Sequence, residues 1–360
     1  MPLRWLNIST STSTSHVTIV PHTTSMISSR IMPTNSIKRI PAIKVSKLFA
    51  VQSRNLSVIP PAQVATFFKN NEGKTIPVDA SWYMPNVPIN PFHEFMKQRL
   101  NSDSIFFDIE KIRDTTSPYP HMLPSKEAFE KEVSELGVKP DSSLLIYDQQ
   151  GIFSACRAAW MFEIFGHDSD KINILNTYPS YLQSFSDPNL VMKMHDAGKK
   201  SNTELVTVPS PHPKSDYKAD FQKHKVVTFD ELKKLVTEDK IGSEYTLIDA
   251  RGAARFTGEA PEPRAGLPSG HIKNAINLPF TELLTPNKQF LSYPTLSNVV
   301  KAKGIDESKP IIVSCGTGVT ACVVRSALQI IGFNADNIAV YDGSWTEWAQ
   351  RAPELVVTDV

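Results

Sequence analysis

The chain has 360 residues, of which 41% are apolar and 9% aromatic, so it can fill a hydrophobic core, and this length favours two domains. A formal net charge of +1 gives no support to the strongly basic surface of a protein that binds nucleic acid or anionic membranes. The three cysteines are too few and too far apart for a disulfide framework, which favours a reducing compartment.

The first 57 residues differ in composition from the rest of the chain. They hold seven basic residues and many Ser and Thr but no acidic residue, since the first acidic residue is Glu72. This composition predicts a mitochondrial transit peptide, with a disordered leader as the alternative. Arg54-Asn55-Leu56-Ser57 resembles mitochondrial processing sites that carry Arg three residues before the cut. A start at an internal Met, such as Met26 or Met32, leaves an additional cytoplasmic form open.

The remainder of the chain is mildly acidic. When the seven basic residues of the leader are removed from the total of 38, 31 basic residues stand against 37 acidic ones. No segment approaches the roughly 18 consecutive apolar residues of a membrane span. We therefore expect no direct contact with nucleic acid or with a membrane.

After the leader, apolar strands alternate with helices, and the pattern occurs twice. The first occurrence predicts a helix at 64–69, strands at 76–80, 104–109 and 144–147, and a helix at 155–165. The second predicts a helix at 230–236, strands at 246–250, 275–278 and 311–314, and a helix at 321–331. Asp79 lies 170 residues before Asp249, and Asp148 lies 167 residues before Cys315. Gene duplication explains these similar offsets.

A proline-rich stretch, residues 209–214, separates the two occurrences and predicts a semi-rigid connector. We therefore expect an N-terminal domain at 58–207, a linker at 208–225 and a C-terminal domain at 226–360. Short apolar strands that alternate with helices indicate an α/β fold, in which each domain has a parallel sheet with helices on both faces. Ligands are expected at the carboxyl ends of the strands.

Cys315 follows the predicted strand at 311–314 and therefore lies at this edge of the second sheet. Gly316 and Gly318 allow the backbone N–H groups of the loop to turn towards a common centre, where they could hold an anion. Such amides, together with the start of the next helix, favour a reactive thiolate. An ordinary buried thiol beside a tight turn remains the alternative. A phosphate-binding P-loop and a cysteine phosphatase are excluded, because Gly-Lys-Ser/Thr is absent and Ala321 stands where the phosphatase Arg would be.

Several motifs together resemble the tandem-rhodanese sulfurtransferases, and most closely the mercaptopyruvate sulfurtransferases among them. The motifs extend over nearly all of residues 76–348. They are Asp79-Ala80-Ser81-Trp82-Tyr83, Phe106-Phe107-Asp108-Ile109, Ser117-Pro118-Tyr119-Pro120-His121-Met122, Gly166-His167, Gly258-Glu259-Ala260-Pro261-Glu262-Pro263-Arg264, Ser269-Gly270-His271-Ile272, Cys315-Gly316-Thr317-Gly318-Val319-Thr320-Ala321 and Tyr341-Asp342-Gly343-Ser344-Trp345-Thr346-Glu347-Trp348.

The resemblance implies two rhodanese-like domains, of which only the second is catalytic. Cys315 is then the catalytic residue, which carries sulfur as a persulfide, whereas Asp148 takes its place in the first domain and cannot carry sulfur. The donor implied is 3-mercaptopyruvate, which leaves as pyruvate, and Arg255 and Arg264 match the arginines that hold its carboxylate and carbonyl. Thiosulfate is expected to serve less well, because Gly316 and Thr317 stand where thiosulfate-preferring relatives place cations.

The other loop residues implied to bind substrate are Gly318, Val319 and Thr320, of which Thr320 is expected to support the loop. Relatives have a His before Ile-Pro-Gly-Ala that has been proposed to join a proton relay. This chain has Arg99-Leu100-Asn101-Ser102 there, so we assign no general base. Fungal sulfurtransferases that supply sulfur for tRNA thiolation look similar in this stretch, and a protein relay of persulfide sulfur is therefore the alternative function.

The acceptors implied are a thiol, cyanide, or a protein such as thioredoxin or a tRNA-thiolation protein. No cofactor is expected, and no metal site, because the His residues show no metal-ligand spacing. Cys156 and Cys322 are expected to be buried core residues. We interpret Asp249 and Arg251 as structural hydrogen-bonding partners.

Overall fold

The computed structural model describes residues 56–184, 192–193 and 209–360. Nearly all of the predicted leader, and residues 185–191 and 194–208 of the predicted N-terminal domain and linker, lie outside the described residues. The part of the chain that the structure describes contains no helix long and apolar enough to cross a membrane.

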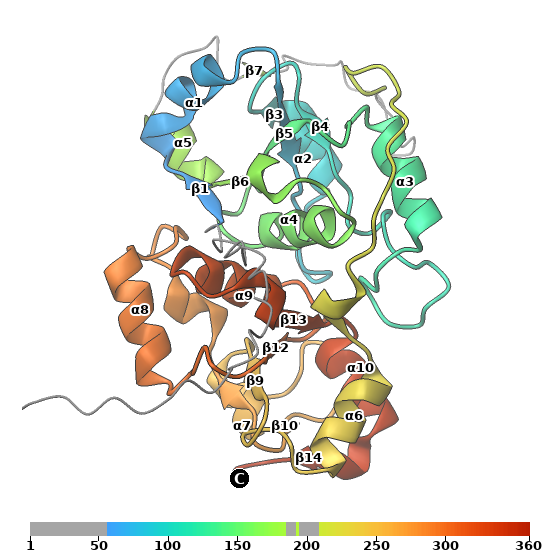
Figure 1. Cartoon of the computed structure of the whole chain (residues 1–360), viewed down its shortest axis with the longest axis vertical. Helices are drawn as coiled ribbons and strands as arrows, with labels where there is room; N and C mark the ends of the chain where they lie inside the picture. The colour runs from blue at the N-terminus through green and yellow to red at the C-terminus, as the bar shows by residue number, and fades with distance from the viewer. Residues whose placement is uncertain (1–55, 185–191, 194–208) are drawn as a thin grey trace, which may run out of the picture. The chain divides into compact units, whose positions relative to one another are not determined.

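Residues 56–184 and 192–193 form the first half of the structure, built around a parallel sheet (Figure 1). Its strands and helices, in chain order, are β1 Ser57–Ile59, α1 Val64–Asn70, β2 Thr75–Asp79, α2 Pro91–Lys97, β3 Gln98–Arg99, β4 Ile105–Phe106, α3 Lys126–Glu135, β5 Ser143–Tyr147, α4 Ala155–Ile164, β6 Ile172–Leu175, α5 Tyr178–Ser184 and β7 Met192–Lys193.

Residues 226–360 form the second half, also around a parallel sheet (Figure 1). Its strands and helices are β8 Val226–Val227, α6 Phe229–Thr237, β9 Thr246–Asp249, α7 Ala253–Thr257, β10 His271–Ile272, β11 Ile276–Asn277, α8 Tyr293–Ala302, β12 Ile311–Ser314, α9 Ala321–Ile330, β13 Ile338–Tyr341, α10 Ser344–Arg351 and β14 Val356–Val357.

The two sheets have the same topology. The first has the strand order β1-β6-β5-β2-β4, and the second has the order β8-β13-β12-β9-β11 when it is read in the same direction. The registers agree as well, because Tyr147 of β5 pairs with Asp79 of β2, and Ser314 of β12 pairs with Asp249 of β9. Asp148 and Cys315 are therefore equivalent positions, each directly after the central strand of its sheet.

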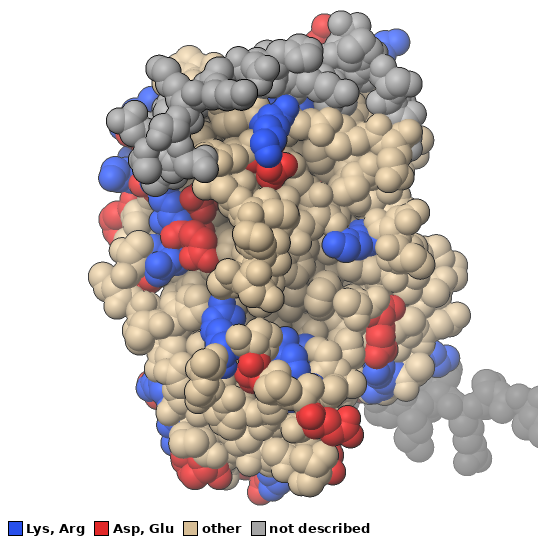
Figure 2. Space-filling model, turned by 180° about the vertical axis from the view of Figure 1, so that it is seen from behind, with Lys and Arg blue, Asp and Glu red and all other residues tan. Residues whose placement is uncertain are grey.

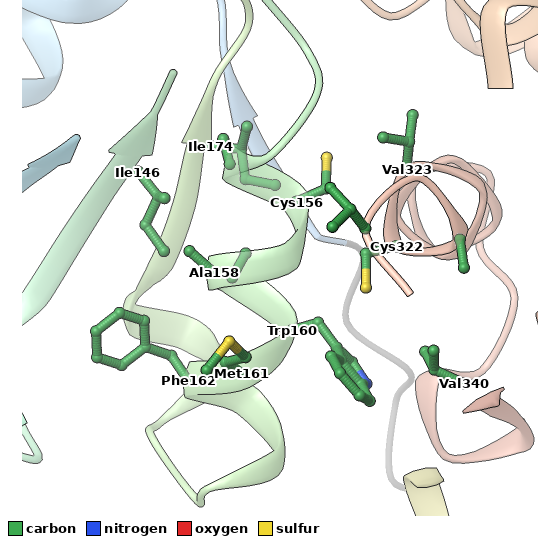
Figure 3. Packing of buried hydrophobic residues seen from close by; sticks show 14 of the residues in the cluster. Ile146, Cys156, Ala158, Trp160, Met161, Phe162, Ile174, Cys322, Val323 and Val340 are labelled. Carbon is green, nitrogen blue, oxygen red and sulfur yellow. The ribbon is translucent and has the colours of Figure 1, made fainter. Parts of the chain in front are cut away.

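Apolar side chains cover both faces of each sheet, as expected for parallel strands. One cluster includes α4 on the first sheet and α9 on the second, and these two helices also pack against each other. A second cluster covers the other face of the second sheet with α6 and α10, and a third covers the first sheet with α1 and α5. Figure 3 shows Cys156 of α4 and Cys322 of α9 among these buried side chains, where burial raises the pKa of both thiols, that of Cys322 to about 12.

The described part of the predicted linker packs on the first half. Tyr217 is buried and lies parallel to the ring of His167, and its backbone N–H donates to Ser134 Oγ at 2.9 Å. Farther along, the amides of Asp220 and Gln222 donate to carbonyl groups at the end of α4. On the face of the molecule in Figure 2, basic and acidic side chains of the described residues are interspersed.

Candidate active site

Cys315 lies at the carboxyl edge of the second sheet, between β12 and α9, and is only 1% exposed. Its backbone is fixed by α10, because its N–H donates to Ser344 Oγ at 3.2 Å and its carbonyl accepts from the Trp345 N–H at 2.9 Å. The carbonyl of Gly316 accepts from the N–H and the hydroxyl of Thr346, at 3.0 and 2.8 Å. The start of the loop is thus held by α10.

The amides that follow Cys315 form an open set of hydrogen-bond donors. The backbone N–H groups of residues 316–321 donate to no described residue, and Thr320, which precedes α9, makes no side-chain cap. Helix N-termini and consecutive amides of this kind bind anions. Gly318 has φ = 78°, which permits this turn of the loop. The geometry provides donors for a thiolate or for the outer sulfur of a persulfide.

The first half shows how such a loop holds an acceptor. The Asp148 carboxyl accepts the N–H groups of Gln150, Phe153 and Ala155, each at 3.0 Å. Burial raises the pKa of this carboxyl to about 7, although the amides act in the opposite direction. The first loop therefore binds its own side chain, and the equivalent amides near Cys315 have no such internal acceptor.

Two arginines expected to bind substrate lie beside the Cys315 loop. Arg255 of α7 is about a quarter exposed and donates through Nε and Nη2 to the buried carboxylate of Glu262. A methyl group on Gly316 would lie 3.4 Å from Arg255 Nη2, which places this guanidinium against the loop. Arg264 is half-buried, and desolvation lowers its pKa, while the charges of Glu110 and Cys315 act in the opposite direction. Arg255 therefore lies against the Cys315 loop, whereas substrate binding by Arg264 stays a prediction.

Arg251 and Asp249 form the hydrogen-bonded pair that we expected. Arg251 is buried, donates to both carboxylate oxygens of Asp249, and lies over the Trp345 ring at 4.0 Å from its centroid. Arg251 also donates to Glu262 Oε1 at 2.8 Å. Glu262 thus joins Arg251 to Arg255 and fixes the orientation of the Arg255 guanidinium.

A hydrogen-bonded chain leads from the loop to His121, which the sequence analysis did not assign. Thr317 Oγ1 lies 3.0 Å from His121 Nδ1, and His121 Nε2 lies 2.9 Å from Glu110 Oε1. Trp82 Nε1 donates to the same Glu110 oxygen at 2.8 Å. Burial lowers the pKa of His121, and the hydrogen bond from His121 lowers the pKa of Glu110 to about 2. A neutral imidazole held by a carboxylate can accept a proton from a hydroxyl.

The sequence left the general base unassigned, and these contacts make His121 a candidate for that role. The stretch at Arg99, where the relay His of relatives was expected, does not supply it, and the Arg99 guanidinium lies over the Phe95 ring. His121 belongs to the motif Ser117-Pro118-Tyr119-Pro120-His121-Met122, from which the sequence predicts no catalytic residue. Because 196 residues separate His121 from Thr317, no local sequence pattern relates the two side chains.

The other predicted site residues take supporting positions. Val319 is 2% exposed and packs in the shared apolar cluster, so it can serve the site through its backbone only. The carbonyl of Gly318 accepts from the Cys322 thiol at 3.3 Å and from Arg157 Nη1 at 3.2 Å. Among the described residues, no group of three His, Cys, Asp or Glu could hold a metal ion.

Comparison with known proteins shows the family of the chain and its fold. The family described as "Rhodanese-like domain" matches residues 228–351. Thiosulfate sulfurtransferase TUM1 of Saccharomyces cerevisiae is 36% identical over 83% of this chain and 96% of its own length. The crystal structure of the Saccharomyces cerevisiae Tum1 protein has a TM-score of 0.73, over 84% of this chain and 98% of the Tum1 chain. The mitochondrial thiosulfate/3-mercaptopyruvate sulfurtransferase 1 of Arabidopsis thaliana is 36% identical over 79% of this chain and 73% of its own.

A third similar protein belongs to a larger assembly. The sulfur transferase subunit of yeast mitochondrial complex I, described as sub-stoichiometric, has a TM-score of 0.71 and 39% identity over 84% of this chain and 100% of its own. All three similarities span both halves of the structure. They show the tandem rhodanese-like fold, with its two parallel sheets and flanking helices.

Proposed function

This chain belongs to the rhodanese-type thiosulfate and 3-mercaptopyruvate sulfurtransferases, and we propose that Cys315 carries the transferred sulfur as a persulfide. The enzyme transfers sulfur between small molecules or to other acceptors. The observation that carries the proposal is the position of Cys315 beside six consecutive N–H groups that donate to no described residue, whereas amides of the corresponding loop in the first half hold the Asp148 carboxyl.

The proposed first step breaks the carbon–sulfur bond of 3-mercaptopyruvate. The Cys315 thiolate attacks the substrate sulfur, and the electron pair of the carbon–sulfur bond goes to the methylene carbon as the enolate of pyruvate. The thiol proton is passed to that carbon, so that pyruvate leaves and Cys315 holds a deprotonated persulfide. An acceptor thiolate or cyanide then takes the outer sulfur and restores the Cys315 thiolate. Splitting the reaction in this way is nucleophilic covalent catalysis.

The arginines and the relay supply orientation and proton transfer in this scheme. Arg255 and Arg264 hold the carboxylate and the carbonyl, which fixes the substrate thiol towards Cys315. The Thr317 hydroxyl takes the thiol proton as it gives its own to His121, and the proton then returns along the same route to the enolate. Glu110 holds the imidazole and balances its charge while it is protonated.

The donor preference can be tested by comparing kcat/KM for mercaptopyruvate and thiosulfate under the same conditions, with cyanide as acceptor. We expect mercaptopyruvate to be used better, because no Lys or Arg stands at 316 or 317 of the loop. A thiosulfate value above that for mercaptopyruvate would contradict the assigned donor. Loss of pyruvate release in Cys315→Ser is expected in either case.

A second candidate function is the delivery of the persulfide sulfur to a protein. The similarity to TUM1 and to a subunit of complex I suggests protein partners for this chain, and we propose thioredoxin or a tRNA-thiolation protein as the acceptor. The leader composition and the mitochondrial relatives support a mitochondrial location, with a cytoplasmic form from an internal start as the alternative. Enzyme loaded with isotopically labelled sulfur should label such an acceptor, and failure to label either protein would leave small-molecule acceptors alone.

A further inference from the structure

Arg157 is a buried arginine that the first half contributes to the neighbourhood of the Cys315 loop. It belongs to α4, is 1% exposed, and its guanidinium lies over the Trp160 ring at 4.6 Å from the centroid. It donates through Nη1 to Asp342 Oδ1 at 2.7 Å and to the Gly318 carbonyl at 3.2 Å. Through Nη2 it donates to the carbonyl of His121. One guanidinium thus joins three segments of the site.

The two carbonyl groups that Arg157 binds belong to residues with left-handed backbones. His121 has φ = 61° and Gly318 has φ = 78°. A non-glycine residue in this region is strained, and His121 therefore needs surrounding contacts to keep its backbone in place. One carbonyl belongs to His121 itself, and the other belongs to Gly318, the residue after Thr317. The hydrogen bonds of Arg157 therefore act on both ends of the Thr317–His121 contact.

Asp342 closes the arrangement from the second half. Its Oδ1 accepts from Arg157, and its Oδ2 accepts from the backbone N–H of Leu123 at 2.7 Å, two residues after His121. The planar guanidinium can donate to Asp342 and to both carbonyls at once, whereas the ammonium group of Lys is a compact point charge. The arrangement therefore depends on the shape of arginine as well as on its charge.

We propose that Arg157 is a positioning residue for sulfur transfer, through which the half without a nucleophile holds His121 and the Cys315 loop at hydrogen-bond distance. This inference rests on the proposed function of Cys315 and Thr317. It adds a positioning residue to His121 and Glu110, the relay residues that the first half already supplies, although the loop of that half carries Asp148 in place of a nucleophile.

Arg325 provides a matched control in the same molecule. It lies on α9, is 1% exposed like Arg157, and also forms an ion pair with a carboxylate of the other half, since Arg325 Nη1 lies 2.7 Å from Glu163 Oε2. Arg325 contacts neither the loop of Cys315 nor His121 in the described structure. Substitution of either arginine removes one buried cross-half ion pair, but only one of them holds the relay.

Charges around His121 provide a readout that loss of stability alone would not change. The charged groups that act on its imidazole are Glu110, which raises the pKa, and Arg157 and Arg264, which lower it, while burial has the largest effect and also lowers it. Loss of the Arg157 guanidinium therefore moves the pKa of His121 upward. The neutral imidazole is the base in this scheme. The acid limb of kcat/KM should therefore move to higher pH in Arg157→Met.

The test compares Arg157→Lys, Arg157→Met and Asp342→Asn with Arg325→Lys, using the full chain at equal folded fractions. We expect kcat for mercaptopyruvate to fall by about 10- to 100-fold in the first three variants, with little change in KM, because misplacement by about 1 Å can cost 100-fold in rate. Arg157→Met should also shift the acid limb, and Arg325→Lys should keep the kcat and the pH profile of the wild type.

Three results would decide against the positioning role. These are an unchanged kcat in Arg157→Lys and Arg157→Met, an equal loss in Arg325→Lys, or an unshifted acid limb in Arg157→Met. If the Arg157 variants do not fold, a wild-type kcat in Asp342→Asn overturns the positioning role, and a lowered kcat supports it. Sulfur loading of wild-type Cys315 is followed by mass in parallel. Wild-type loading with no defect in the variants overturns only this inference, whereas no loading of the wild type overturns the proposed function.

Discussion

Replacement of Thr317 by Val tests the proton relay with little change of shape. Valine keeps the methyl group and the branched shape of a side chain that is only 5% exposed, but it removes the oxygen that lies 3.0 Å from His121 Nδ1. Loss of a positioned acid–base group costs about 100- to 10,000-fold in rate. This corresponds to about 3 to 5 kcal/mol of transition-state stabilisation.

The same substitution also has a cost in stability. His121 is 1% exposed, and without the Thr317 hydroxyl its Nδ1 loses the hydrogen-bond partner that the structure gives it. A buried polar group left unpaired costs about 1 to 3 kcal/mol, so the free energy of unfolding should fall by this amount. Urea unfolding measures this loss of stability separately from the effect on the rate.

The assay is pyruvate release from mercaptopyruvate at saturating concentration, with Thr317→Ser as the matched control. Serine restores the hydroxyl and should return kcat to within a few-fold of the wild-type value. A wild-type kcat in Thr317→Val would refute the relay, because a hydroxyl that transfers a proton cannot be dispensable. A Thr317→Ser variant as slow as Thr317→Val would show that the methyl group, and not the hydroxyl, is required.

Four further predictions concern the rest of the site. Arg255→Ala should lower kcat/KM for mercaptopyruvate about 10- to 100-fold, as expected for lost charge-assisted hydrogen bonds. Stability measured by urea should change less, because Glu262 keeps its hydrogen bond from Arg251 Nη1. Gly318→Ala should lose about 1 to 2 kcal/mol of stability, because residue 318 has a left-handed backbone. Its kcat should also fall, because the new methyl group would lie 2.7 Å from Arg157 Nη1. An active and stable variant would contradict this geometry. Burial raises the pKa of the Asp148 carboxyl to about 7 in the folded protein, whereas its ordinary value is 3.8. The free energy of unfolding of the wild type should therefore fall relative to that of Asp148→Asn as the pH rises from about 4 to 7. Parallel curves of unfolding free energy against pH for the two proteins would rule this out. Burial holds the pKa of His121 below 6.5, so kcat/KM should stay level down to that pH and fall only under more acidic conditions, with no such fall in the residual activity of His121→Gln.

Local sequence patterns were sufficient to predict the central strands and the position of Cys315. The predicted strand at 311–314 is β12, and the helix predicted at 321–331 is α9 at Ala321–Ile330. β6 and β13 were not predicted, and in β6 the polar Asn173 interrupts the apolar run. The duplicated order of strands supplied the correspondence between Asp148 and Cys315.

Contacts between the two halves could not be predicted in this way. Thr317 and His121 are 196 residues apart, and Arg157 and Asp342 are 185 residues apart, so no local period relates them. Each of these residues has an ordinary structural interpretation by itself: a loop hydroxyl, a core histidine, a buried ion pair. Their roles depend on the packing of α4 against α9, which brings the first half to the loop of the second.

The most direct test of sulfur transfer through Cys315 is the intact mass of the full chain after brief treatment with 3-mercaptopyruvate. We predict a gain of one sulfur atom, which is absent in Cys315→Ser and is lost when cyanide is added. Cys156 and Cys322 are both buried and remain in Cys315→Ser, so they serve as internal controls for nonspecific sulfur uptake. An unchanged wild-type mass, or an equal gain in Cys315→Ser, would contradict the proposal that Cys315 carries the sulfur.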